Sequence, residues 1–318
     1  MASPVRHRLP LSRWCRTFGV VDFARSDERS ISVFRIRNLS IAGPLEMRLM
    51  NLRRLFPLVL LGLSAAPLAA QSAPSSVFIE ALTWEEIRDR IADGGTTIII
   101  PTAGTEQKGP HMVMGEHRYV MEYTMDEVAR VLGNTLVSPI MTYVPEGSWG
   151  DEPTGHMRMP GTITLPEEWF RDLLVHTAKS HAAGGFTDIA FIGDSGGNQG
   201  GMSAVTDQLN EEWAGTGVRA HFIGDYYAKS NGDINAHMRS LGFTVDQVGT
   251  HAGLLDTSQM LFVNPNHVRM DAAAPDGGFE GSGVSGDPSL ATAALGEVQL
   301  RIKIDNALAQ IRSSIASR

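Results

Sequence analysis

The chain has 318 residues and a formal net charge of −8, and its basic side chains gather at the start: residues 1–54 hold 11 of the 27 Lys and Arg but only 4 of the 35 Asp and Glu. The remaining chain therefore carries a formal charge of −15, and because so acidic a surface repels phosphate backbones, we do not expect nucleic acid as a partner. The only cysteine, Cys15, falls in the basic segment, so we expect no disulfide after it, and only His, Asp or Glu could bind a metal there.

Residues 50–70 have the pattern of a secretory signal peptide: a basic start, an apolar centre and a small-residue exit. The apolar run is shorter than the roughly 20 residues that a membrane-spanning helix needs. We therefore expect cleavage, no membrane association afterwards, and a periplasmic or secreted location. Residues 1–49 would then be a disordered, mis-assigned upstream translation, and a single domain would cover residues 77–318.

Helices and strands alternate along this domain. Each expected strand is a nearly continuous apolar run, which is typical of a parallel sheet covered on both faces. The sequence therefore predicts an α/β fold, a three-layer α/β/α sandwich with a mostly parallel sheet. We expect helices over 82–93, 119–132, 166–183, 199–213, 233–241 and 289–314, and strands over 96–101, 135–144, 186–193 and 218–226.

Ionisable side chains are dense directly after the first expected strand, where clefts form in open α/β sheets. A Gly-Pro turn within the segment would direct neighbouring side chains inward. Glu and His at such a separation can bind one metal, although the spacing also suits a solvated loop. The group consists of Glu106, Lys108, His111, Glu116 and His117.

The segment Gly193–Asn198 reads Gly-Asp-Ser-Gly-Gly-Asn, like the nucleophile motif of trypsin-like proteases. Those proteases are all-β, so an alternating α/β chain excludes that interpretation. The nucleophile-elbow spacing Gly-x-Ser-x-Gly is nevertheless present around Ser195. A serine hydrolase that uses Ser195 and His251 is therefore an alternative.

Two further segments contain histidines. A glycine-rich loop over residues 145–155, with Trp149, precedes His156 and suits a substrate cover or a subunit contact, while His156 itself is equally a structural histidine. His251 lies on a loop at the end of a strand, where a histidine commonly transfers protons near neutral pH. Asp256 follows in a position to begin a helix and is either a site residue or an N-cap.

Taken in order, these segments resemble the creatininase family of metal-dependent amidohydrolases. The resemblance spans about residues 77–315 and implies that family's fold for a catalytic domain over 77–318, together with a homo-oligomer, a ring-like hexamer. The corresponding segments are Glu106–His111 with His117, His156–Thr162, Gly193–Asn198, His251–Ser258 and Gly286–Pro288.

The resemblance also implies a metal site. In the family, four positions hold a pair of metal ions, typically zinc or manganese; this chain keeps Glu106 and has Lys108, His117 and Ser195 at the other three. An ammonium group there would repel a second cation, so we expect one divalent metal, zinc first and manganese or iron as alternatives. Its expected ligands are Glu106, His117 and Asp194.

The expected reaction is hydrolysis of a non-peptide amide C–N bond in a small molecule, with cyclic amides included. Lys108 would supply the charge of the second metal and His251 would transfer a proton. The alternatives are the serine hydrolase and a metal-free pseudoenzyme or small-ligand binding protein. The expected catalytic residues are His251, Lys108, Ser195 and Asp256, and the expected substrate-binding residues are His111, Trp149, His156 and Asn198.

Overall fold

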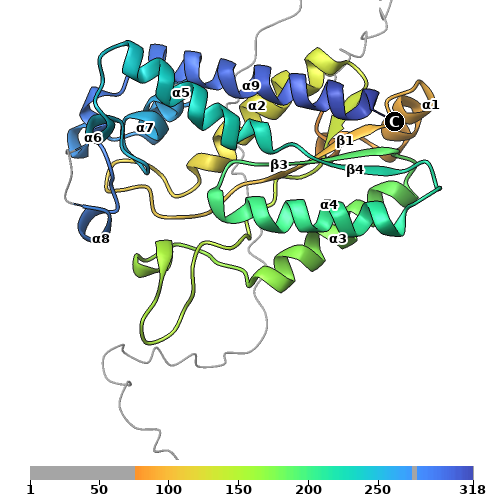
Figure 1. The fold of residues 1–318 in the computed structure, drawn as a ribbon, viewed down its shortest axis with the longest axis horizontal. Helices are drawn as coiled ribbons and strands as arrows, with labels where there is room; N and C mark the ends of the chain where they lie inside the picture. Colours follow the sequence, from red (N-terminus) through yellow and green to blue (C-terminus); the bar gives the residue numbers. More distant parts are fainter. Residues whose placement is uncertain (1–75, 274–277, 318) are drawn as a thin grey trace, which may run out of the picture. The chain divides into compact units, whose positions relative to one another are not determined.

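A computed structural model describes residues 76–273 and 278–317 and confirms the α/β fold (Figure 1). The upstream segment, the expected signal peptide and Cys15 lie outside the described residues. Among the described residues, four parallel strands form one sheet in the order β2-β1-β3-β4. The strands are β1 (Thr97–Thr102), β2 (Thr135–Val137), β3 (Asp188–Gly193) and β4 (Arg219–Phe222).

Apolar side chains of the central strands alternate between two cores. Ile99 and Ile192 pack into the core beneath α2 and α9, whereas Ile98 and Phe191 pack into the core beneath α3 and α4. Because successive side chains of a strand point to opposite faces, a continuous apolar run is buried on both sides. The expected three-layer sandwich is confirmed.

Helices cover both faces of the sheet, with α2 and α9 on one side and α3 and α4 on the other (Figure 1). Among the described residues, no helix is both long and apolar enough to cross a bilayer. The helices are α1 (Trp84–Ala92), α2 (Glu116–Leu132), α3 (Glu167–Ala183), α4 (Gln199–Glu212), α5 (Ala228–Ser240), α6 (Val245–Val248), α7 (Leu254–Val263), α8 (Phe279–Ser282) and α9 (Ala293–Ala316).

The outer strands are shorter than expected. The strand expected over 135–144 ends at Val137, shortly before Pro139, which has no N–H to donate to a sheet. The strand expected over 218–226 ends at Phe222, and Gly224–Tyr226 turns into a 3-10 helix. Short outer strands leave room for the loops that surround the carboxyl ends of β1 and β3.

The last helix also begins later than expected, at Ala293 rather than Ser289. The hydroxyl of Thr292 accepts a hydrogen bond from the backbone N–H of Leu295 at 3.2 Å and so fixes the start. Pro288–Leu290 forms a separate 3-10 turn. The helix expected over 233–241 begins earlier, at the start of α5.

Candidate active site

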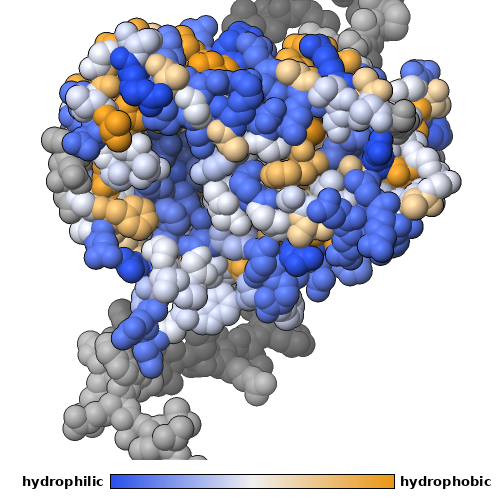
Figure 2. Space-filling view, viewed as in Figure 1, coloured by the Kyte–Doolittle hydropathy of each residue, from blue (hydrophilic) through white to orange (hydrophobic). Residues whose placement is uncertain are grey.

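A cavity of about 1010 Å³ opens at the carboxyl ends of the central strands. Thr102 at the end of β1 pairs with Gly193 at the end of β3, so the segments that follow the two strands emerge side by side. They meet the loop before α7 and the inner face of α9. Figure 2 shows the hollow, with hydrophilic residues at its base.

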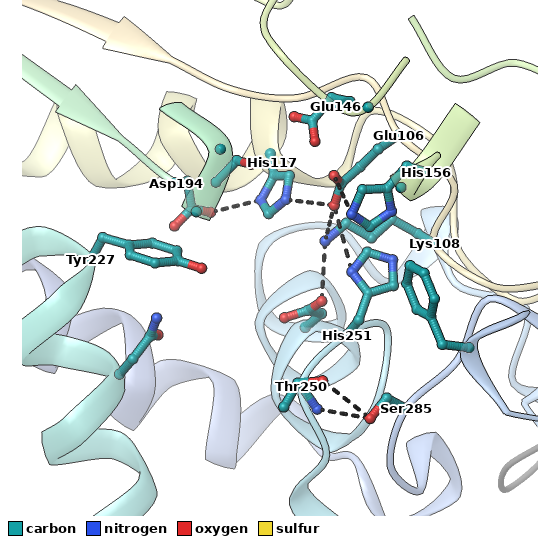
Figure 3. Close-up of a pocket in the computed structure, with 18 of the residues that line it drawn as sticks. Glu106, Lys108, His117, Glu146, His156, Asp194, Tyr227, Thr250, His251 and Ser285 are labelled. Carbon is teal, nitrogen blue, oxygen red and sulfur yellow. Dashed lines mark hydrogen bonds and ion pairs between the residues drawn. The ribbon is translucent and has the colours of Figure 1, made fainter. Parts of the chain in front are cut away.

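Glu106 is the centre of the site and only 2% exposed. One carboxylate oxygen, Oε1, lies 3.0 Å from both Lys108 Nζ and His117 Nε2 (Figure 3). Burial alone would raise the pKa of Glu106, but the charges of Lys108 and His117 hold it well below its usual range. Glu106 is therefore an ionised carboxylate at the wall of the cavity.

Lys108 supplies a fixed positive charge. Its Nζ lies 3.0 Å from Glu106, 3.2 Å from Glu116 and 3.1 Å from Asp256, and its side chain is 1% exposed. Burial alone would lower the pKa of Lys108, but these three carboxylates raise it well above the ordinary value. The ammonium group is thus charged and held by three carboxylates.

Asp256 is not the N-cap of α7. It lies in the first turn, after the N-cap Gly253, and its carboxylate accepts a hydrogen bond from the backbone N–H of Ala252 at 2.8 Å. Although burial opposes ionisation, the charge of Lys108 holds the pKa of Asp256 well below its usual range. The sequence suggested either an N-cap or a site residue. The structure contradicts the N-cap and places Asp256 in the cavity wall.

His117 lies between two carboxylates (Figure 3). Its Nε2 is 3.0 Å from Glu106 and its Nδ1 is 3.1 Å from Asp194. A carboxylate only accepts, so both nitrogens donate and the ring is a cation; burial opposes this, but the surrounding acids raise the pKa of His117 well above its ordinary value. The expected ligands Glu106, His117 and Asp194 thus form a hydrogen-bonded row rather than converging on one point.

Two more imidazoles approach Glu106 from the other side. His156 Nε2 lies 3.2 Å from Oε2, and His251 Nδ1 lies 3.6 Å from Oε1. Burial lowers the pKa of His156, and burial together with the charge of Lys108 lowers the pKa of His251 to about 3. Both rings are therefore neutral near pH 7. The amide of Gln107 donates to Nδ1 of His156 at 3.4 Å, so Nε2 of that ring carries the hydrogen and donates to Glu106.

Ser195 lines the cavity but lacks the contact that a serine nucleophile needs. Among the described residues, no histidine forms a hydrogen bond with its hydroxyl; His251 instead directs its nitrogens to Gln107 and Glu106. Activation of a serine requires an adjacent base. The geometry therefore gives the serine-hydrolase alternative no support.

Of the expected substrate-binding residues, His156 lines the cavity formed by the described residues, and the other three do not. His111 is buried against the hydroxyl of Thr257 at 2.9 Å, and Asn198 donates to the hydroxyl of Thr102 at 3.2 Å. Both bonds support the walls of the site. Trp149 is 62% exposed on the glycine-rich loop.

Glu146, which the sequence analysis did not identify, has a buried carboxyl group in the cavity wall. Burial, together with a hydrogen bond to Glu106, raises the pKa of Glu146 to about 9, so it is a protonated acid near pH 7. Gly104 makes room for it, because a Cβ there would lie 2.2 Å from Oε1 of Glu146. Nothing in the surrounding glycine-rich loop distinguishes this residue.

Sequence reasoning also missed Lys303 of α9, whose ammonium forms an ion pair with Asp194. Here a signal existed: Lys303 falls at helical spacing between Leu300 and Ala307, on the face that α9 buries. A lysine on an apolar helix face needs a buried acid as partner. Burial would raise the pKa of Asp194, but Lys303 and His117 lower it.

A parallel α/β sheet with a polar cavity at its strand ends, containing ionised carboxylates and neutral imidazoles, has its cavity where open α/β sheets commonly bind their ligands. The family profile described as creatinine amidohydrolase matches residues 80–311. The chain belongs to the creatininase family.

Curated relatives differ in the reactions that their names describe. The 3-dehydro-scyllo-inosose hydrolase of Thermotoga maritima is 33% identical over 102 residues, which cover 32% of this chain and 30% of that protein. The mycofactocin precursor peptide peptidase of Mycolicibacterium smegmatis is 25% identical over 63% of this chain and 78% of that protein. The creatinine amidohydrolase of Pseudomonas putida is 32% identical over 28% of this chain and 34% of that protein.

Solved creatininase structures share the fold. A creatinine amidohydrolase crystal structure superposes with a TM-score of 0.61 at 22% identity, covering 76% of this chain and 98% of that one. A creatininase described with manganese gives a TM-score of 0.62, also at 22% identity, and covers 76% of this chain and 99% of that one. A variant described as a Zn-Zn type is equally similar in fold. The last two of these neighbours are described with manganese and with zinc, respectively.

Proposed function

We propose that this chain hydrolyses a non-peptide amide C–N bond of a small molecule with the help of one divalent cation, zinc first and manganese or iron as alternatives. The observation that carries the proposal is the ionised carboxylate of Glu106, which faces neutral imidazoles of His156 and His251 at the cavity wall. Family membership supports it, since relatives named creatinine amidohydrolase and peptide peptidase cleave C–N bonds. The proposed substrates include cyclic amides.

When bound, a divalent cation polarises a substrate carbonyl and makes water a stronger acid. The residues of the chain supply the rest. Lys108 keeps Glu106 ionised and in place. Glu146 donates a proton to the leaving nitrogen, because it is a protonated acid in the cavity wall. This assignment replaces His251, whose Nε2–H already donates to the backbone carbonyl of Gln107 at 2.7 Å.

One observation favours the pseudoenzyme alternative. Lys108, His117 and Lys303 already place three positive charges against the buried carboxylates. Such a network is close to neutral without a metal. A protein that binds only a small ligand, with no metal, must balance its buried charges in this way. The two functions differ in whether any amide is turned over.

The test is to assay the purified protein against creatinine, other cyclic amides, linear amides and short peptides, with zinc, manganese or a chelator. We expect metal-dependent release of amine from a non-peptide amide. In Glu146→Gln we expect kcat to fall by about 10²- to 10⁴-fold while the unfolding midpoint stays unchanged, since the neutral acid is replaced by a neutral amide.

The matched control is Glu152→Gln, an exposed residue of the same loop, which should retain full activity. Hydrolysis that is unaffected by the chelator, or by Glu146→Gln, would contradict the proposed chemistry. Binding of amides without turnover of any of them would favour the pseudoenzyme.

A further inference from the structure

Among the residues that the structure describes, one ring nitrogen of His251 has no hydrogen-bonding partner. Its Nε2 lies 2.7 Å from the backbone carbonyl oxygen of Gln107, and because a carbonyl only accepts, Nε2 carries the hydrogen. The other ring nitrogen, Nδ1, faces Oε1 of Glu106 at 3.6 Å, which is too far for a hydrogen bond between them, so Nδ1 directs a lone pair at the carboxylate. Two atoms that carry lone pairs repel each other unless a cation lies between them.

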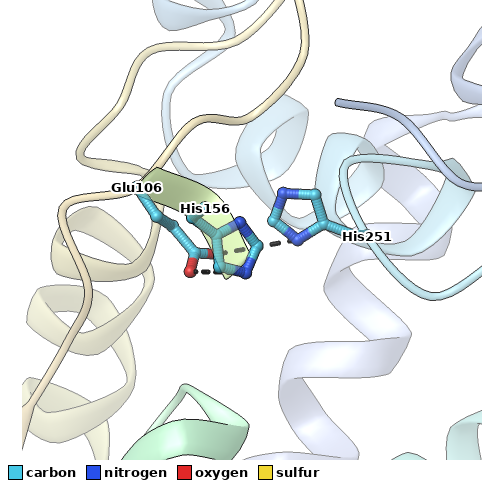
Figure 4. A group of neighbouring side chains, drawn as sticks. All are labelled: Glu106, His156 and His251. Carbon is cyan, nitrogen blue, oxygen red and sulfur yellow. Dashed lines mark ion pairs between the residues drawn. The ribbon is translucent and has the colours of Figure 1, made fainter. Parts of the chain in front are cut away.

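His156 brings a third ligand atom to the same place. Its Nε2 lies 3.2 Å from Oε2 of Glu106, and its ring centroid lies 4.4 Å from that of His251. Because Gln107 donates to Nδ1 at 3.4 Å, Nε2 carries a hydrogen that points to the carboxylate, and a cation at this place would replace that hydrogen. Figure 4 shows both imidazoles directed at the carboxylate, and the three ligand atoms lie within 4.8 Å of one another. Tetrahedral zinc with ligands at about 2.0–2.2 Å places them roughly 3.3–3.6 Å apart, so these separations suit one ion.

A second group, Glu116, His117 and Asp194, is equally compact but unsuited to a cation. Both nitrogens of His117 already donate to carboxylates. The ammonium group of Lys303 contacts Asp194 and would repel a divalent ion. The group is also deeper, since the side chains of Glu116 and Asp194 are 1% exposed against 20% for His156.

We infer that the divalent cation of this chain binds between Glu106, His156 and His251, on the more exposed side of the position implied by the family resemblance. Two His and one Glu with an open fourth position suit zinc. The carbonyl of Gln107 orients His251, as an outer partner of a metal ligand does. Phe279 packs edge-on against both rings, with centroids 5.3 and 5.4 Å away.

Lys108 does not prevent binding at this place. Lys108, His117 and Lys303 offset three of the four negative charges of Glu106, Glu116, Asp194 and Asp256, so one negative charge is left over. Lys108 and His117 lie against Oε1 of Glu106, whereas His156 lies against Oε2. The inference rests on the proposed function, because it states where the cation of that hydrolysis binds. Its test needs no turnover.

The test is to titrate the purified full-length protein with Co²⁺, follow the visible absorption of the bound ion, and measure metal per chain by plasma mass spectrometry. We expect one Co²⁺ per chain with a four-coordinate spectrum. The affinity should fall at least about tenfold in His156→Ala and in His251→Ala. It should be unchanged in Asp194→Asn and in His176→Ala, an exposed histidine of α3.

Circular dichroism of each variant checks that it folds, and His156→Gln and His251→Gln replace any alanine variant that does not. Loss of Co²⁺ in Asp194→Asn, its retention in both histidine variants, or a failure of the parent protein to bind Co²⁺ would each overturn the inference. If one ion binds as inferred but no amide is hydrolysed, the metal site is supported and the proposed function is contradicted. If hydrolysis proceeds without metal, the metal site is contradicted and amidohydrolase activity is still supported.

Discussion

Lys108 is a buried ammonium that pairs with the buried carboxylates of Glu106 and Glu116 and with the partly exposed carboxylate of Asp256. In Lys108→Met, these carboxylates would remain in a low-dielectric interior without their counter-charge. We therefore expect the free energy of unfolding to fall by about 3–5 kcal/mol, the usual loss when one partner of a buried ion pair is removed. Urea unfolding at pH 7 measures this change.

Lys179→Met is the matched control for this experiment. The ion pair of Lys179 with Glu212, at 2.8 Å, joins two helices but is largely exposed. Its loss should change the free energy of unfolding by less than about 1 kcal/mol. Equal effects of the two substitutions would show that the charge of Lys108 is not needed for folding.

Single residues of the site were predictable only in part. Glu106, Lys108 and His117 follow a recognisable strand, so the sequence could bring them together at its end. Their pairing depends on residues far away in the chain: Asp194 lies 77 positions after His117, and Lys303 a further 109. Local spacing carries no information about such contacts. The sequence therefore could not show that Glu106, His117 and Asp194 form a hydrogen-bonded row and do not converge on one point.

Among whole elements, the type of each was easier to predict than its ends. The amphipathic repeat of α9 was visible, but the start depended on the side chain of Thr292 turning back to the helix. The apolar run after Thr135 suggested a long strand, but only three consecutive residues pair with β1, and Met141 adds an isolated bridge to Thr102. Helix ends are decided by single caps, and strand ends by neighbouring strands that the local sequence does not specify.

The crossing of α7 and α9 requires Gly296. A Cβ at this position would lie 2.0 Å from the backbone carbonyl oxygen of Ser258, so the two helices would have to separate. In Gly296→Ala we expect the free energy of unfolding to fall by about 1–3 kcal/mol despite the better helix propensity of alanine. Differential scanning calorimetry measures the change.

Gly232 of α5 is the control for that substitution, because a Cβ there would meet nothing within 4 Å. Gly232→Ala should stabilise the protein by about 0.5–1 kcal/mol, through propensity alone. Were Gly296→Ala to stabilise the protein by the same amount, close approach of α7 and α9 would not be the reason for this glycine.

For the molecule as a whole, we propose a periplasmic or secreted homo-oligomer, a hexamer by family resemblance, without nucleic-acid or membrane partners. The acidity of the chain after residue 54 supports the absence of polyanionic partners. Trp149 on the glycine-rich loop and Trp169 on α3 are 62% and 65% exposed. Large exposed aromatic side chains are enriched at protein interfaces, so they support contacts between subunits.

Global stability should also depend on pH through His181, far from the proposed metal ligands. His181 shares a hydrogen bond with the hydroxyl of Ser138 at 2.9 Å, and burial lowers its pKa from 6.5 to about 4. Between these values the unfolded chain binds more protons than the folded one, so stability falls as the pH falls from 6.5 to 4. Allowing for partial exposure, this histidine should account for about 1–2 kcal/mol of the loss.

The measurement is urea unfolding of the parent, His181→Gln and His176→Gln at several values between pH 4 and 7. We expect the parent and the exposed-site variant His176→Gln to lose stability in parallel, and His181→Gln to lose about 1–2 kcal/mol less over the same interval, because its amide does not titrate. The comparison cancels the carboxylates of the site, which all three proteins share. Three parallel curves would mean that His181 is protonated as readily in the folded chain as in the unfolded one, and that its burial opposes no charge.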